Sequence, residues 1–529
     1  MTCHDTSAPT RRPWYATLGG FLAVLVTAAL AGTAATRAGA SGRGAAAVAW
    51  GDCPADELAG LPPAVRPRFS CATYAVPTDY RHPAAGTTGL ALLRRAAEDP
   101  GRRIGSLFIA AGGPGGSGIA RLQELEGRLP AEVVRRFDLV GFDQRGVGRS
   151  DPLRCFGTEE QAAAVYGQIV GVPVTGAEIG STLHGNRELT AACAATAGPL
   201  LPHMSTVDVA RDLDRLRQGV GEEKLNLLGY SYATLLGATY ANLFPQRVRA
   251  FVLDGNVDPR LRTSDGMEYL RQHAAGAEAV IDDFLALCAG AGPRCAFSGG
   301  DPRAKFAELR QRLRLGPVLV PGAGPVDLTT FTAGVADSLY DPQAYPDLAA
   351  GLQAVYAAIH PDAPAPAGSG RLLERAAAAG TPYTGSEAGL AVNCLDEPFP
   401  RRQADYPRAA ARWERQSPTA GRPEAFSQLA CATWPVREAE RYSGPWNRPT
   451  ANPLLLFGNR HDPATNLTFN TRTAASLGSA RLVTVDLFGH TVIGRARSAC
   501  ADAIAGRYLT DLVLPAPNTV CPADAQPFD

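Results

Sequence analysis

Ser231 stands between two apolar runs in the stretch "LNLLGYSYATLLGATYA" (residues 225–241). A serine hydroxyl becomes a nucleophile when a base removes its proton during the attack. A sharp strand-to-helix turn can hold such a serine above a sheet, and small residues two before and two after it let the turn close. Gly229 and Ala233 occupy those positions, with alanine in place of the usual second glycine. The pattern favours a nucleophile; the alternative is a buried strand running into a helix, with an incidental serine.

A glycine-rich segment, "GGPGGSG" (112–118), follows the apolar run 106–111. Acyl transfer needs two N–H donors aimed at the developing oxyanion. We expect the amides of Gly113 and of Tyr232, the residue after Ser231, to supply them. The alternatives are a simple turn and a phosphate-binding loop. The phosphate loop is disfavoured, because no Lys-Ser or Lys-Thr pair follows and the spacing is not G-x-G-x-x-G.

The base and its orienting acid should follow Ser231 in the order Asp or Glu and then His, each on a loop after a strand. "LLLFGNRHDPAT" (454–465) places Asp462 after one apolar run, and "VTVDLFGHT" (483–491) places His490 after the next. This order predicts Ser231, Asp462 and His490 as a catalytic triad.

Four other titratable residues are less suitable for these roles. His461 lies on the loop expected to carry the acid, and Asp486 ends the strand before His490, too late in the order. His273 and His360 fall in a helical region and are predicted to be ordinary surface histidines.

The elements that must position these residues alternate between apolar strands and helices. Strands are expected within 71–80, 89–98, 106–111, 137–143, 224–229, 248–255, 453–458 and 480–486, and helices at 205–221, 234–244, 466–477 and 498–512. Unbroken apolar strands alternating with helices indicate an α/β fold with a mostly parallel sheet covered on both faces.

Residues 259–449 have a different character. Ala-rich helical stretches (274–290, 348–359 and 371–380) alternate there with Pro- and Gly-rich loops, and strand signals are sparse. We therefore predict a core formed by residues 41–258 and 450–529, with a helical cap inserted at 259–449.

The N-terminus resembles an export signal. Arg11 and Arg12 precede an apolar stretch at 16–35 and small residues ending in "AGA" at 38–40, so residues 1–40 are predicted to be a signal peptide. The alternative is a membrane anchor, because about 20 apolar residues can span a bilayer. After signal removal we expect a secreted protein without a stable membrane anchor; the export route is left open.

Composition narrows the classes of partner. Of 529 residues, 45% are hydrophobic and 19% charged, and Lys plus Arg equal Asp plus Glu at 51 each. Removal of residues 1–40 leaves 48 basic and 50 acidic residues, a net charge of −2. The chain lacks the excess of positive charge that would indicate nucleic acid as a partner. Nothing in the sequence calls for a metal or organic cofactor.

Cysteine usage also indicates export. Beyond Cys3, ten cysteines form an even set with no zinc-like spacing, as expected for disulfides in an oxidising compartment. Sequence proximity suggests the following pairs, although spacing alone leaves the connectivity open: Cys53–Cys71, Cys155–Cys193, Cys288–Cys295, Cys394–Cys431 and Cys500–Cys521.

The chain resembles the secreted tripeptidyl aminopeptidases of actinobacteria, within the α/β-hydrolase superfamily and close to the prolyl iminopeptidases. The matching motifs span nearly the whole mature chain: "GGPGGSG", "DQRGVGRS", "LLGYSYAT", "VLDGNVDP", "NRHDPAT", "FGHT" and "YLTDLVLPAPNTVC". Two positions depart from the pattern, Ala111 where such enzymes often have Asn, and Ala233 in the elbow. Arg145 of "DQRGVGRS" is expected to pair with a nearby acid in an architectural role.

The resemblance implies an α/β-hydrolase fold with a helical cap, the triad named above, and release of short peptides from free N-termini. An aminopeptidase must bind a substrate ammonium, for which Asp396, Glu397 and Asp258 are the candidate carboxylates. Solvated surface acids are the alternative for each. Two rival functions are a carboxylesterase with the same triad and a catalytically silent binding protein.

Overall fold

The computed structural model describes residues 46–364, 383, 385, 387–436 and 439–529. The predicted signal peptide (1–40) and the helical stretch predicted at 371–380 lie outside the described residues. No helix within the described ranges combines the length and apolarity needed to cross a membrane.

A nine-stranded sheet forms the centre of the fold, in the order β1-β2-β4-β3-β5-β6-β9-β10-β11. β1 pairs with β2, and β2 with β4, in antiparallel fashion, whereas all the other neighbours are parallel. The strands are β1 Phe69–Pro77, β2 Thr87–Arg95, β3 Gly105–Ala110, β4 Phe137–Phe142, β5 Leu225–Tyr230, β6 Val248–Asp254, β9 Leu454–His461, β10 Ala480–Phe488 and β11 Val520–Pro522. The mostly parallel sheet is confirmed; β11 was not predicted.

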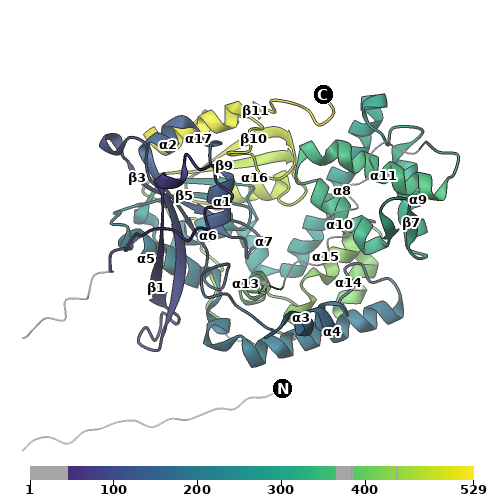
Figure 1. Ribbon diagram of the computed structural model, residues 1–529, viewed down its shortest axis with the longest axis horizontal. Helices are drawn as coiled ribbons and strands as arrows, with labels where there is room; N and C mark the ends of the chain where they lie inside the picture. Colours follow the sequence, from purple (N-terminus) through teal and green to yellow (C-terminus); the bar gives the residue numbers. More distant parts are fainter. Residues whose placement is uncertain (1–45, 365–382, 384, 386, 437–438) are drawn as a thin grey trace, which may run out of the picture. The chain divides into compact units, whose positions relative to one another are not determined.

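Both faces of the sheet are buried, because alternate side chains of each strand enter different cores. In β3, Phe108 and Ala110 join one cluster and Leu107 and Ile109 the other. The first cluster also contains residues of α5 Thr206–Gly219, α6 Ala233–Leu243 and α16 Leu467–Ser476. The second contains residues of α1 Gly118–Glu124, α2 Ala131–Arg136 and α17 Ala499–Asp511 (Figure 1).

Between β6 and β9 the chain is largely helical, as the Ala-rich pattern predicts. The helices in the described part of this segment are α7 Pro259–Ser264, α8 Gly266–Ala291, α9 Pro302–Leu313, α10 Leu328–Ser338, α11 Tyr345–Ile359, α13 Ala388–Asp396, α14 Asp405–Trp413 and α15 Gly421–Ser427. A short hairpin, β7 Val318–Val320 with β8 Gly324–Val326, is also present. Phe284, Leu309, Phe331 and Leu352 belong to a third core that α8 to α11 share. The division at 259 and 449 stays a prediction.

The Cys-bounded segment between β4 and α5 is helical as well, which the sequence did not indicate. It contains α3 Glu159–Tyr166 and α4 Gly176–Thr196. The Thr190 hydroxyl lies 3.0 Å from that of Thr433, and Arg187 Nη1 donates to Gln403 Oε1 at 2.8 Å. A segment that precedes α5 in the sequence therefore packs against residues that follow α5 by more than 180 positions.

Arg145 is fully buried and forms the ion pair that "DQRGVGRS" predicts. Its Nε and Nη2 bind the Asp212 carboxylate at 2.7 and 2.6 Å, and its remaining donors bind backbone carbonyls, including that of His203. Because its buried charge is paired with Asp212 on α5 and its other donors bind backbone carbonyls, this arginine links β1, α5 and the loop after β4.

Five disulfides form in the pairing that sequence proximity suggests. Cys53–Cys71 and Cys500–Cys521 lie at the two edges of the sheet, where β1 and β11 are the outer strands. Cys155–Cys193, Cys288–Cys295 and Cys394–Cys431 join helices and loops. Each bridge limits the unfolded chain and thereby favours the folded state.

Candidate active site

Ser231 occupies the turn between β5 and α6 with a backbone φ of 55°. A non-glycine residue in this left-handed region is strained, and such turns raise a side chain above the carboxyl edge of a sheet. A Cβ on Gly229 would lie 3.0 Å from the carbonyl oxygen of Ala233, so the glycine is needed to close the turn. A Cβ on Gly112 would lie 2.6 Å from that of Ser231. The glycine-rich loop therefore approaches the serine directly.

His490 and Asp462 meet across the loops that follow β10 and β9. Nδ1 of His490 lies 3.0 and 2.9 Å from the two carboxylate oxygens of Asp462. The carboxylate also accepts from the amides of Ala464 and Thr465 and from the Thr465 hydroxyl, each at 2.8 Å. This arrangement holds Nδ1 toward the acid and leaves Nε2 free to exchange a proton.

Ser231 and His490 line one cavity of about 440 Å³. Among the described residues no hydrogen bond joins the two side chains, and His490 Nε2 is buried without a partner. Triad hydrogen bonds are often long before substrate binds and shorten in the complex. A buried ring nitrogen without a partner, at a cavity that Ser231 also lines, is chemically able to accept a proton.

Asp254, at the end of β6, holds the His490 loop. Its Oδ2 accepts from the amides of Val492 and Ile493, each at 2.8 Å, and its own carbonyl accepts from the Ser231 amide at 2.9 Å. Burial raises the pKa of this carboxyl to about 6, against the two amide donors that lower it. Asp254 thus contacts both the serine turn and the histidine loop. The sequence did not single out Asp254, because no local pattern reveals that its carboxylate binds the amides of Val492 and Ile493.

The amides proposed for the oxyanion are those of Tyr232, directly after Ser231, and of Gly113, on the glycine-rich loop that approaches it. Tyr232 is the N-cap residue of α6, at a helix end whose first N–H groups have no partner within the helix, and Gly113 has a φ of 109°. Neither amide donates any of the backbone hydrogen bonds that the described residues form outside helices and strands. The Tyr232 hydroxyl lies 2.5 Å from that of Thr206, which fixes the ring beneath the turn. The role of the two amides stays a prediction.

A second cavity meets Ser231 from the side of the helical segment between β6 and β9. We call it the insertion-side cavity; it has a volume of about 230 Å³, and Ser231, Gly113, Arg262, His273, Glu397 and Glu424 are among its lining residues. Arg262 Nε donates to Glu397 at 2.7 Å, and its Nη2 donates to Asn393 at 2.8 Å. Glu397 is therefore neutralised by a buried arginine.

Glu424 lies 3.3 Å from Nδ1 of His273 in the same cavity, and among the described residues no other cation lies within ion-pair distance of it. Burial disfavours the charged imidazole, but the Glu424 carboxylate outweighs it and raises the pKa of His273. The prediction that His273 is an ordinary surface residue is wrong, because it lines the cavity. His360, in contrast, pairs with Glu308 at 2.7 Å near the surface.

Of the three predicted ammonium-binding acids, Glu397 alone lines the insertion-side cavity. Asp396 is turned toward Thr206, whose hydroxyl donates to it at 2.5 Å, and burial raises its pKa to about 7. Asp258 caps α7 by accepting from the Leu261 amide at 3.1 Å. The expectation fails for Asp396 and Asp258, because Asp396 binds Thr206 of α5 and Asp258 caps α7. Glu424 was missed, since an acid in a short helix carries no sequence signal.

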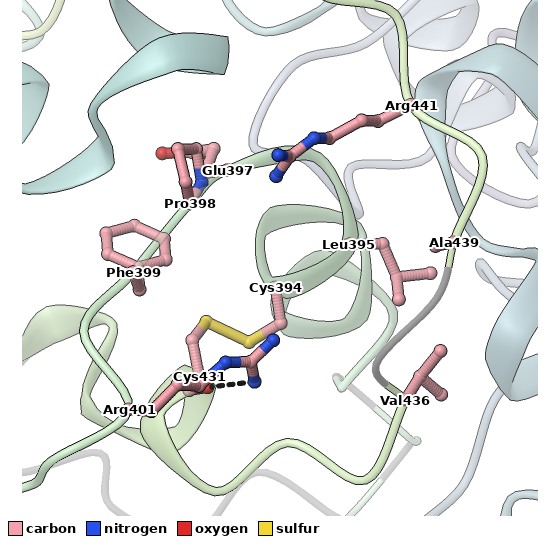
Figure 2. A pocket seen from close by; sticks show the side chains of 10 residues that line it. All are labelled: Cys394, Leu395, Glu397, Pro398, Phe399, Arg401, Cys431, Val436, Ala439 and Arg441. Carbon is pink, nitrogen blue, oxygen red and sulfur yellow. Dashed lines mark hydrogen bonds between the residues drawn. A yellow bond between two sulfur atoms is a disulfide. The ribbon is translucent and has the colours of Figure 1, made fainter. Parts of the chain in front are cut away.

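Glu397 also borders a neighbouring cavity of about 340 Å³ (Figure 2). The Cys394–Cys431 disulfide lies beside it, and Arg401 Nη1 donates to the carbonyl of Cys431 at 3.2 Å. The disulfide thus connects the last turn of α13 to the segment after α15, and Glu397 is the residue that directly follows α13. This link fixes one wall of the insertion-side cavity.

The two residues rejected from the triad have other partners. His461 Nδ1 lies 2.7 Å from Asp283 and stacks on Phe488. Asp486 pairs with Arg460 at 2.8 Å and has a largely exposed side chain. Neither residue lines the cavities that contain Ser231.

Comparison with known proteins agrees with this architecture. A family model described as alpha/beta hydrolase fold matches residues 106–277, and one described as TAP-like protein matches residues 417–521. The tripeptidyl aminopeptidase of Streptomyces lividans is 32% identical over 503 residues, which cover 91% of this chain and 87% of that protein.

Two relatives from Mycobacterium tuberculosis are equally similar. Serine protease Hip1 is 32% identical over 469 residues, covering 85% of this chain and 87% of the relative. Carboxylesterase B is 32% identical over 471 residues, covering 85% and 86%. The turn at Ser231, the His490–Asp462 pair and these matches lead to one assignment: the chain belongs to the tripeptidyl aminopeptidase family of serine hydrolases with the α/β-hydrolase fold.

Proposed function

We propose that this hydrolase is an exopeptidase that releases short peptides from free N-termini through an acyl-enzyme. The observation that carries the proposal is the strained turn at Ser231, which lines the same cavity as a histidine held by a buried carboxylate. Relatives named tripeptidyl aminopeptidase and serine protease support a peptide as the substrate.

In the proposed mechanism, His490 Nε2 takes the proton of Ser231 Oγ as the oxygen attacks the scissile carbonyl. Asp462 keeps the imidazole in the tautomer with a proton on Nδ1 and stabilises the imidazolium. The amides of Gly113 and Tyr232 bind the oxyanion, and loss of one such donor typically costs about 10²–10³ in rate. His490 then protonates the leaving amine, and water hydrolyses the acyl-enzyme by the same steps.

Recognition of the substrate ammonium is assigned to the insertion-side cavity. Glu424 is the primary anchor, because in the described part of the chain an imidazole is its one charged neighbour within ion-pair distance. Glu397 is a secondary anchor, because Arg262 already neutralises much of its charge. A cavity of about 230 Å³ between Glu424 and Ser231 limits how many residues precede the cleaved bond, which suits an exopeptidase.

Substrate class is tested with unblocked and N-acetylated tripeptide anilides beside a short-chain aryl ester. We expect turnover of the unblocked anilide and at least about 10-fold lower kcat/KM for the acetylated one, because acetylation removes the ammonium that the carboxylate binds. Carboxylesterase is the second candidate, since a relative of that name is equally similar. Hydrolysis of the ester with no turnover of unblocked peptide would establish the esterase instead.

Replacement of the anchor tests the recognition step. Glu424→Gln is expected to lower kcat/KM for the unblocked anilide about 10-fold, mainly through KM, and to leave the acetylated substrate unaffected, because the ion pair is lost only where an ammonium exists. The matched control is Glu308→Gln, which also breaks a Glu–His pair but lines neither cavity that contains Ser231. Equal losses for both substrates would contradict the assignment.

We also propose export, with peptides as the external substrates. Five disulfides in one chain suit an oxidising compartment and would not persist in most cytoplasms. Mass spectrometry of the protein recovered from culture medium tests this, with cleavage near residue 40 as the expected result.

A further inference from the structure

The cavity shared by Ser231 and His490 is rich in arginine. Arg121, Arg495 and Arg497 line it together with Glu124 and Asp341. We call it the arginine-lined cavity. It is distinct from the insertion-side cavity, and the two share only Gly113, Ser231 and Tyr340 among their lining residues.

Chemistry decides which part of a substrate each cavity receives. The leaving group must lie against His490 Nε2, because that nitrogen delivers its proton. His490 lines the arginine-lined cavity and not the insertion-side cavity. The acyl part with its free ammonium therefore fits the insertion-side cavity, and the leaving part fits the arginine-lined one.

Two of the three arginines already have anionic partners. Arg121 Nη1 lies 2.8 Å from Glu124, and Arg497 Nη2 lies 2.9 Å from Asp341. Arg497 Nη1 also donates to the carbonyls of His490 and Thr491 at 3.2 and 3.3 Å, so this arginine is committed to the histidine loop.

Arg495, in contrast, has no carboxylate partner among the described residues. Within the described part of the chain its guanidinium forms no hydrogen bond or ion pair, and its Nε is buried without a partner, as is that of Arg121. Burial, and then the positive charge of Arg495, lower the pKa of Arg121. Buried donors without acceptors, next to an excess of positive charge, are stabilised by an anion.

We propose that Arg495, assisted by Arg121, binds a carboxylate on the leaving part of the substrate, and that this hydrolase prefers peptides acidic just beyond the scissile bond. The inference rests on the proposed function. The carboxylate has two possible sources: an Asp or Glu side chain on the first leaving residue, or the C-terminal carboxylate of a leaving single residue. A planar guanidinium binds either in the same bidentate way.

The test uses four unblocked peptides with the same acyl part, three alanines, and different leaving residues: Glu-amide, Gln-amide, Gly with a free carboxylate and Gly-amide. Cleavage is followed by mass spectrometry of the released residue. In the wild type, at least one acidic member is expected to exceed its amide partner about 10-fold in kcat/KM, and the pair that differs identifies the source of the carboxylate.

The ratio of kcat/KM within each pair is then measured in variants, because it is independent of the fraction of active enzyme. Arg495→Gln should bring the ratio close to one, and Arg495→Lys, which retains the charge without the planar fork, should give an intermediate ratio. Arg507→Gln, an exposed arginine on α17 away from this cavity, should keep the wild-type ratio.

Three results would overturn the inference. Equal cleavage of acidic and amide peptides by the wild type would refute it while leaving the proposed function intact. An undiminished ratio in both folded Arg495 variants would do the same. Turnover of none of the four peptides would refute the proposed exopeptidase function and this inference with it.

Discussion

Ser231→Ala is expected to lower kcat/KM for every substrate by about 10⁴-fold or more, because it removes the hydroxyl proposed to form the acyl-enzyme. Folding should be retained, since the substitution removes one oxygen that donates none of the hydrogen bonds in the described structure. Alanine at position 231 must adopt the same φ of 55°, a strained conformation for a non-glycine residue. We therefore expect at most a small loss of stability.

Covalent labelling provides a second measurement for the same variant. A fluorophosphonate probe should label the wild type at Ser231 and not label Ser231→Ala. Ser264→Ala, at an exposed position in α7, serves as the matched control and should label normally. A folded wild type that neither labels nor hydrolyses ester or peptide would favour the silent binding protein.

Asp462→Asn should have the second-largest effect, a loss of about 10⁴-fold in kcat. The present carboxylate accepts from His490 Nδ1, two backbone amides and the Thr465 hydroxyl. An amide nitrogen in place of one oxygen would face these donors and favour the opposite imidazole tautomer, in which Nε2 carries the proton and cannot accept one from Ser231. KM should change little, because Asp462 lies behind the histidine.

Asp486→Asn is the matched control for this prediction. Asp486 is an aspartate from the same region of the sequence, but it pairs with Arg460 at the surface. Its loss should leave kcat within about two-fold of the wild type, as surface ion pairs contribute little. A large loss in Asp486→Asn together with near-normal Asp462→Asn would exchange the two assignments.

Local patterns predicted the sheet and the three catalytic candidates because both depend on short-range physics. The strands through Leu227, Val252 and Leu456 are continuous apolar runs, as expected where both faces are covered. The turn at Ser231 requires small neighbours within two residues, so it has a local signature. Chain order then predicted His490 and Asp462, because loops after parallel strands meet at one edge.

The surroundings of the triad could not be predicted, because they arise between segments that are distant in sequence. Glu424 and Arg495 carry no motif, and they become functional candidates only where the fold places them at a cavity beside Ser231. Asp396 looked as suitable as Glu397 in the sequence, but adjacent residues at a helix end point in different directions. Only the tertiary structure decides that Asp396 turns toward Thr206 while Glu397 lines the cavity.

The direct pairing of β6 with β9 has an evolutionary consequence. Val252, Leu253 and Asp254 are in register with Leu455, Leu456 and Phe457, although residues 255–453 lie between the two strands in the chain. The intervening segment can therefore lengthen, shrink or be remodelled without disturbing the strands on which the nucleophile and base depend. Substitutions in the intervening segment can therefore change substrate specificity while the residues on the sheet stay the same. In this way, proteins with one scaffold can diverge into peptidases and esterases.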